Sequence, residues 1–126
     1  MESNEIKKIL PFDDIWENLE VLERRLIDVS SSSNKYLTSI SQYLIKAGGK
    51  RFRPIVTSLA GKFGNEKDNI ENIIDAGVCV ELIHIGSLYH DDVIDNATTR
   101  RGVESSNSKW SSTLSILAGD YLLARS

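Results

Sequence analysis

Hydrophobic residues recur at helical spacing along most of the chain and predict a series of α-helices. Over about residues 13–29 they fall three or four positions apart, as on one face of an amphipathic helix. Asp13 or Asp14 is expected to cap this helix, because a carboxylate accepts hydrogen bonds from its first free N–H groups. A second helical pattern covers about residues 36–47 and ends at Gly48-Gly49, since glycine commonly follows the last helical turn.

Two further helices are predicted next, and the second of them is the longest in the chain. Pro54 suits the first turn of a helix that ends near Gly64-Asn65, because the missing N–H of proline is not needed there. The next helix is expected from about Ile70 to Asp95, with Asp68 or Asn69 as its cap. Its apolar residues lie nearly all round the helix, which is typical of a central, buried helix.

The remaining segments are polar, apart from one helical pattern at the end. Residues 1–10 are expected to be frayed, and residues 96–108 are expected to form a polar loop. A last helix is predicted after Ser111, where apolar residues recur up to Leu123. The pattern therefore predicts an all-α fold of about five helices, within one domain that covers residues 1–126.

Composition narrows the class of protein. The chain has 15 Lys+Arg and 18 Asp+Glu, a net charge of −3, which argues against a nucleic-acid partner. Its one cysteine, Cys79, cannot form an internal disulfide and is interpreted as a small core residue in a reducing compartment. Because we find no apolar run of about 18 residues and no signal-peptide pattern, we expect a cytoplasmic protein without a transmembrane segment.

Three aspartates form a DDxxD cluster at the end of the long helix: Asp91, Asp92 and Asp95. On a helix, Asp91 and Asp95 are neighbours with Cβ atoms roughly 5–6 Å apart, so their carboxylates repel each other. A cation relieves this repulsion. We expect Mg²⁺, which prefers oxygen ligands and commonly bridges one or two carboxylates to substrate phosphates. For this motif alone, a solvated acidic surface is the alternative interpretation.

Basic residues occur at two places that suit a diphosphate. Arg100 and Arg101 follow the aspartates, and a guanidinium group binds phosphate through two parallel hydrogen bonds. Lys50, Arg51 and Arg53 follow the glycine pair and lie at the start of a predicted helix, where anions are attracted. Taken alone, this second group is also explained by a helix end followed by exposed basic residues.

His84 and Glu81 are polar residues on the otherwise apolar long helix. His84 lies on the same stripe of the helix as Asp91 and Asp95. A hydrogen-bonded core histidine is the simplest interpretation of His84 by itself. The side chains of Glu81, His84, Asp91 and Asp95 nevertheless each require a partner, since burying an unpaired charge is unfavourable.

From about Ile40 onward the chain resembles the N-terminal part of the trans-isoprenyl diphosphate synthases, which include polyprenyl, geranylgeranyl and farnesyl diphosphate synthases. The resemblance rests on five motifs in the family's order: GGKRFRP, ELIHIGSLYHDDVID, TTRRG, NSKW and LAGDYLLA. It implies an isoprenoid-synthase-type helical bundle around a central cavity, with a homodimer or other self-association. It also implies a prenyltransferase that condenses an allylic diphosphate with isopentenyl diphosphate.

The resemblance assigns a role to each matching residue. Four side chains match the isopentenyl diphosphate site: Lys50, Arg53, His84 and Arg101. Asp91 and Asp95 match the Mg²⁺ ligands, with Asp92 supporting them, and Arg100 matches the contact to the allylic diphosphate. Mg²⁺ and the arginines would offset the negative charge of the leaving diphosphate while the double bond of isopentenyl diphosphate attacks the allylic cation.

The turn before the aspartates indicates a product length by analogy with the family. Gly86 and Ser87 occupy the turn that forms the floor of the product cavity in these synthases. Both are small, which predicts a geranylgeranyl or longer polyprenyl product. Tyr89 either narrows the tunnel or belongs to the core.

The chain departs from the family in length, because a whole synthase also carries a second aspartate-rich motif. No such motif follows Asp120, which we interpret as structural. We therefore expect a partial domain that is inactive unless a second chain completes the site, and exposed apolar faces that favour self-association. The alternatives are a non-catalytic subunit of a heteromeric synthase that binds diphosphate and Mg²⁺, and a purely structural helical interaction module.

Overall fold

The computed structural model describes residues 3–126, and their side chains from residue 6 onward. It contains seven helices: α1 Ser3–Ile9, α2 Asp13–Val29, α3 Lys35–Lys46, α4 Phe52–Gly61, α5 Glu66–Ile94, α6 Ser106–Lys109 and α7 Ser112–Arg125. The strands β1 Thr99–Arg100 and β2 Val103–Glu104 form an antiparallel ribbon between α5 and α6. The predicted all-α fold is confirmed, and the two short helices α1 and α6 add to the five expected.

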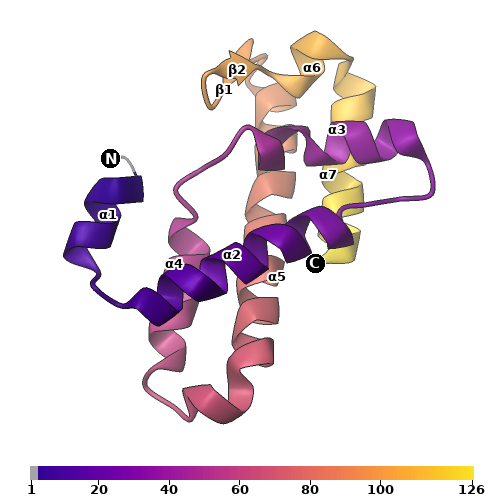
Figure 1. Cartoon of the computed structure of the whole chain (residues 1–126). Helices are drawn as coiled ribbons and strands as arrows, with labels where there is room; N and C mark the ends of the chain where they lie inside the picture. Colours follow the sequence, from indigo (N-terminus) through magenta and orange to yellow (C-terminus); the bar gives the residue numbers. More distant parts are fainter. Residues whose placement is uncertain (1–2) are drawn as a thin grey trace.

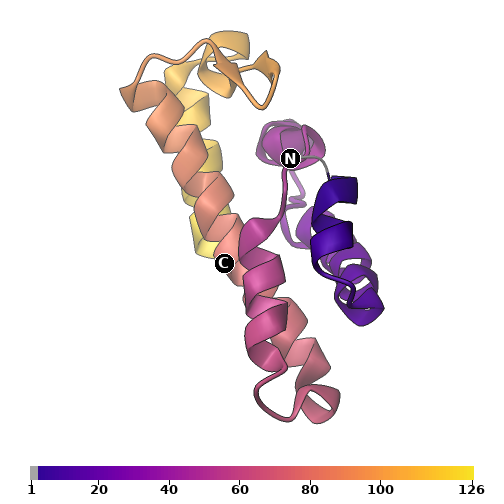
Figure 2. The ribbon, with the colours of Figure 1, turned by 90° about the vertical axis from the view of Figure 1, so that its left-hand side faces the viewer.

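Helix α5 is the central element of the fold. It is 29 residues long and packs against α2, α4 and α7. Figure 1 shows α2 crossing α5, and Figure 2 shows α4 and α7 lying along α5 as one layer, with α1, α2 and α3 in a second layer. The ribbon and α6 cover the end of α5 that carries the aspartates.

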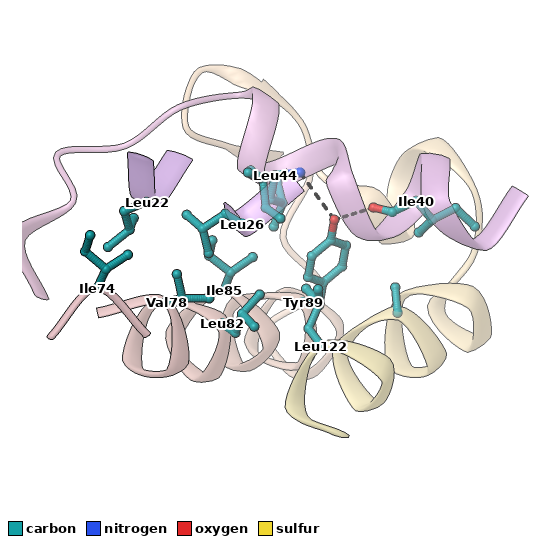
Figure 3. Close-up of a cluster of buried hydrophobic side chains, with 12 residues drawn as sticks. Leu22, Leu26, Ile40, Leu44, Ile74, Val78, Leu82, Ile85, Tyr89 and Leu122 are labelled. Atoms are coloured by element: carbon teal, nitrogen blue, oxygen red, sulfur yellow. Dashed lines mark hydrogen bonds between the residues drawn. The ribbon is translucent and has the colours of Figure 1, made fainter. Parts of the chain in front are cut away.

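The core lies between these two layers. It comprises Leu22, Leu26, Ile40, Leu44, Ile45, Ile74, Val78, Leu82, Ile85, Tyr89, Ala118 and Leu122. The Tyr89 hydroxyl donates a hydrogen bond to the Ile40 carbonyl and accepts one from the Leu44 N–H at 3.2 Å (Figure 3). The buried ring of Tyr89 therefore ties α5 to α3, and of its two predicted roles the structure supports the core.

The acidic residues expected to cap helices lie inside the first turn instead. Phe12 and Asn65 occupy the N-cap positions of α2 and α5, and neither side chain caps its helix. Asp14 pairs with Lys62, and Asp68 accepts a hydrogen bond from the side chain of Asn65 at 2.5 Å. The helix dipole stabilises acidic groups in the first turn. Because Asp68 lies in the first turn and not at the cap, α5 begins about one turn earlier than predicted.

Two segments expected to be irregular contain secondary structure. Residues 3–9 form α1, whose Lys7 ammonium lies 5.4 Å from the centre of the Trp16 ring; residues 1–2 of the expected frayed segment lie outside the described residues. In the predicted polar loop, Arg101 and Gly102 join the two strands with φ values of 53° and 76°. Two successive positive φ angles are typical of a tight type I′ hairpin turn.

Among the described residues, α5 is long and apolar enough to cross a membrane by length and composition. Its most apolar window of 18 residues has a mean hydropathy of 1.2, and 44% of that window is buried. The helix was predicted but not its length and apolarity as a candidate span, because polar residues interrupt its apolar run. The core helix of a soluble protein meets the same criterion, so the cytoplasmic location stays a prediction.

Candidate functional site

A cavity of about 340 Å³ brings together all four residues predicted to bind isopentenyl diphosphate. It lies among the segment before α4, the middle of α5 and the turn of the ribbon. The lining residues are Gly49, Lys50, Arg51, Phe52, Arg53, Glu81, His84 and Arg101. Its walls thus carry four permanent positive charges and one carboxylate, which is the composition of a site for a polyanion.

The backbone before α4 has a conformation that brings two guanidinium groups close together. Gly48 has a φ of 89°, and Arg51, the N-cap of α4, is left-handed with a φ of 49°. A Cβ atom at Gly49 would lie 2.8 Å from Nη1 of Arg51 and 3.1 Å from Cζ of Arg101. Glycine is therefore required at position 49 because both guanidinium groups pack directly against its Cα.

Arg51 and Glu81 form an ion pair in the site that was not predicted from the sequence. Glu81 Oε1 lies 3.3 Å from Nη1 of Arg51, and Glu23 of α2 accepts hydrogen bonds from the same guanidinium group. Burial opposes the charged form of Arg51, but the hydrogen bonds and charges of the two glutamates outweigh it and raise its pKa. The signal in the sequence was Glu81 itself, a polar residue on an apolar helix without an evident partner.

Arg101 is held by backbone carbonyls and by the same glutamate. Its Nη1 donates hydrogen bonds to the carbonyls of Leu44, at 2.7 Å, and Gly48. Its Nη2 lies 3.9 Å from Oε1 of Glu81. Burial, followed by the nearby charge of Arg51, lowers the pKa of Arg101 from its ordinary value, although the group stays charged.

The imidazole of His84 lines the cavity, and its lowered pKa favours the neutral form. Burial, and then the positive charges of Arg53, Arg101 and Arg100, lower its pKa against the opposing charge of Asp91. The ring also lines a second cavity of about 540 Å³ between α4 and α5. That cavity is largely apolar, with Phe52, Arg53, Val56, Thr57, Val80, Ile83, His84 and Ser87 in its walls.

The structure separates the three aspartates of the DDxxD cluster into two kinds. Asp91 and Asp95 are exposed at the last turn of α5, whereas Asp92 is fully buried. Arg100, assigned above to the allylic diphosphate, pairs with Asp92 and does not line the cationic cavity. Asp92 Oδ2 is buried without a hydrogen-bond partner in the described part of the chain.

The carboxylates fit a metal ion that takes most of its ligands from elsewhere. Among residues 3–126, no group of three or more His, Cys, Asp or Glu side chains converges as a closed metal site. Two exposed carboxylates one turn apart match the way Mg²⁺ is held, with waters and substrate phosphates completing its coordination. Asp91 and Asp95 are therefore the residues that would hold such a cation.

Comparison with known proteins agrees with this arrangement. A sequence profile of the family described as Polyprenyl synthetase matches residues 34–126. The chain belongs to this family. Heptaprenyl diphosphate synthase component 2 of Bacillus subtilis is 37% identical over 123 residues, which are 98% of this chain and 35% of that protein.

Solved structures of this family have the same fold. Heptaprenyl diphosphate synthase from Staphylococcus aureus matches with a TM-score of 0.84 and 37% identity, over 88% of this chain and 35% of that one. A polyprenyl synthase from Caulobacter crescentus, solved with calcium and isoprenyl diphosphate, matches with a TM-score of 0.82 and 30% identity, over 98% of this chain and 36% of that one. The chain thus spans about a third of the length of these relatives.

The packing of α7 against α5 changes the interpretation of the two small residues before the aspartates. A Cβ at Gly86 would lie 3.0 Å from the Gly119 carbonyl and 3.1 Å from Cγ of Leu123. Gly86 is therefore small because α7 packs closely against α5, and it does not line the apolar cavity. Ser87 does line that cavity, and its place in a product cavity stays a prediction.

Proposed function

We propose that this chain supplies the isopentenyl diphosphate site and the first metal-binding carboxylates of a polyprenyl diphosphate synthase. The reaction would condense an allylic diphosphate with isopentenyl diphosphate to a longer prenyl diphosphate. The observation that carries the proposal is the convergence of four residues from three separate segments on one cationic cavity: Lys50, Arg53, His84 and Arg101. Membership of the polyprenyl synthetase family supports it.

In this proposal the two cavities bind the two parts of one substrate. Lys50, Arg53 and Arg101 neutralise and orient the diphosphate, and neutral His84 supplies a hydrogen bond without adding charge. The apolar walls formed by Val56 and Ile83 suit a hydrocarbon chain next to it. Mg²⁺ held by Asp91 and Asp95 would act as a Lewis acid on the phosphate oxygens of the allylic substrate.

Titration calorimetry with isopentenyl diphosphate in Mg²⁺-free buffer tests the cationic cavity. We expect Lys50→Ala and Arg53→Ala each to weaken binding by about ten- to hundredfold, since each removes a charge-assisted hydrogen bond. Lys67→Ala is the matched control, because Lys67 is an exposed lysine of α5 outside the cavity. Equal affinity in all four proteins would contradict the proposal.

A separate titration tests the proposed cation site. We expect Mg²⁺ to strengthen the binding of inorganic pyrophosphate to the unaltered chain, and Asp91→Asn or Asp95→Asn to remove that effect. Asp28→Asn removes an exposed carboxylate of α2 and serves as the control. A Mg²⁺ effect that survives in the Asp91 and Asp95 variants would place the cation elsewhere.

A second candidate function is that of one component of a synthase made of two different chains. The Bacillus subtilis relative is named as component 2 of its heptaprenyl diphosphate synthase. Large apolar side chains are also exposed on this chain, among them Phe63 at 95% and Phe52 at 67%. Such side chains favour association, so we propose a homodimer or a pairing with another chain. Sedimentation velocity decides: a homodimer predicts a single dimeric species, whereas a clean monomer at micromolar concentration argues against self-association.

A further inference from the structure

Glu81 is a buried carboxylate beside a cavity that is suited to an anion. Its side chain is 2% exposed, and it lies on α5 one turn before His84. Among the described residues that line the cavity it is the one acidic side chain. A negative charge at this position repels a bound diphosphate, so Glu81 must contribute something that offsets the repulsion.

One oxygen of Glu81 is shared by two arginines that would otherwise repel each other. Oε1 lies 3.3 Å from Nη1 of Arg51 and 3.9 Å from Nη2 of Arg101. Both guanidinium groups pack against the Cα of Gly49, and both arginines have left-handed backbones, with φ values of 49° and 53°. Two guanidinium groups that are close together and largely buried repel each other. A carboxylate near both of them offsets this repulsion.

The two arginines do not depend on Glu81 equally. Arg51 has a second carboxylate, because Nε and Nη2 donate to Glu23, with Nη2 3.0 Å from Oε2. Among the described residues, the remaining partners of Arg101 are the neutral carbonyls of Leu44 and Gly48. Removal of Glu81 would therefore leave Arg51 paired, but would leave Arg101 next to a like charge without a counterion.

We propose that Glu81 is a positioning residue of this cavity, which holds the guanidinium of Arg101 beside Arg51 in the orientation that binds a diphosphate. The inference rests on the proposed function, since it takes the cavity to bind a diphosphate. When Glu81 is replaced by a neutral residue, the direction of the change in diphosphate affinity distinguishes a positioning role from a purely electrostatic one. Loss of a negative charge alone strengthens anion binding, whereas loss of positioning weakens it.

The test is titration of inorganic pyrophosphate in Mg²⁺-free buffer into the unaltered 126-residue chain, Glu81→Gln and Glu23→Gln. Both variants change the net charge by the same amount and remove a carboxylate from Arg51, but only Glu81→Gln removes one from Arg101. We expect Glu81→Gln to weaken binding by about tenfold or more, and Glu23→Gln to bind as tightly as the unaltered chain or slightly more tightly. Tighter binding by Glu81→Gln, or equal losses in both variants, would overturn the inference.

A second readout does not depend on the ligand. In the free protein, hydrogen exchange at the Nη2–H groups of Arg101, which face Glu81, should be faster in Glu81→Gln than in Glu23→Gln when followed by nitrogen-15 NMR. Equal rates overturn the inference. If Glu81→Gln fails to fold, Glu81→Asp replaces it, because this variant keeps the charge but moves the carboxylate away from the arginines by one methylene. Unchanged pyrophosphate affinity in Glu81→Asp would also overturn the inference. Absence of binding by the unaltered chain overturns the proposed function and this inference together, whereas binding that Glu81→Gln leaves intact overturns the inference alone.

Discussion

Arg100 binds the buried carboxylate of Asp92 through two nitrogens, with Nη2 2.5 Å and Nε 2.9 Å from the same oxygen, Oδ1. The pair joins the end of α5 to strand β1 of the ribbon. Asp92 has no exposed surface, and the side chain of Arg100 is 31% exposed. The hydrogen bonds and charge of Asp92 raise the pKa of Arg100 against a weaker opposing effect of burial.

Arg100→Ala should destabilise the chain, because it leaves the Asp92 carboxylate buried and unpaired. We expect a loss of about 3 kcal/mol in the free energy of unfolding. This is the lower end of the range for breaking a buried ion pair, because Arg100 is partly exposed to water. Urea denaturation measures the change. Arg25→Ala, which removes exposed pairs with Glu71 and Asp75, should cost less than about 1 kcal/mol. Similar losses in both variants would contradict the buried pair.

Tyr89→Phe should weaken the attachment of α3 to α5. The change removes the hydroxyl that donates to the Ile40 carbonyl and accepts from the Leu44 N–H, both in the backbone of α3. We expect a loss of about 1–2 kcal/mol in the free energy of unfolding, measured by denaturant titration. Tyr36 is exposed, so Tyr36→Phe should lie within about 0.5 kcal/mol of the unaltered chain.

Gly119→Ala should destabilise the contact between α7 and α5 despite the better helix propensity of alanine. An added Cβ would lie 2.9 Å from the Gly86 carbonyl and 2.5 Å from Nε2 of His90. Either α7 must move away or His90 must leave its contact with the Ile116 carbonyl. We expect a net loss of about 1–3 kcal/mol, as for other overpacked sites. A rise in the thermal midpoint would show that the helices are not in close contact here.

The stability of the chain should depend on pH through His84. Its pKa is lowered in the folded state from 6.5, so the unfolded chain takes up this proton first as the pH falls. Between 6.5 and the lowered pKa the unfolded state binds more protons, and the free energy of unfolding therefore decreases with falling pH. Above about pH 7 this contribution to stability is fully present.

Denaturant unfolding of His84→Gln between about pH 7.5 and about pH 5.5 checks this prediction, since the variant should lose that part of the pH dependence. His90→Gln is the control, because His90 contacts Asp120 and the Ile116 carbonyl rather than the arginines. The prediction is wrong if the two variants respond to pH in the same way.

Much of the fold could be predicted because the spacing of apolar residues determines it locally. The bounds of α2 match the prediction for residues 13–29, and Ser111 caps α7 by accepting a hydrogen bond from the Leu114 N–H. The starts of helices were less certain, because an acidic residue such as Asp68 is favourable both as a cap and in the first turn.

The candidate site was predicted as far as motifs identify residues by their order along the chain. Lys50 and His84 do line one cavity, as the resemblance implied. The link from Glu23 through Arg51 to Glu81 could not be predicted, because it depends on how α2 packs across α4 and α5. Gly86 was assigned to a cavity floor because sequence spacing does not show which helix face meets α7.

The single long helix α5 carries Glu81 and His84 at the cationic cavity and Asp91 and Asp95 at its end. At 1.5 Å per residue, the seven residues from His84 to Asp91 set an axial offset of about 10 Å between the two groups. This offset is a property of helical pitch and not of any side chain. One residue inserted between them would rotate one group by about 100° relative to the other, so a change in length here would misalign the two groups whatever side chains the interval carries.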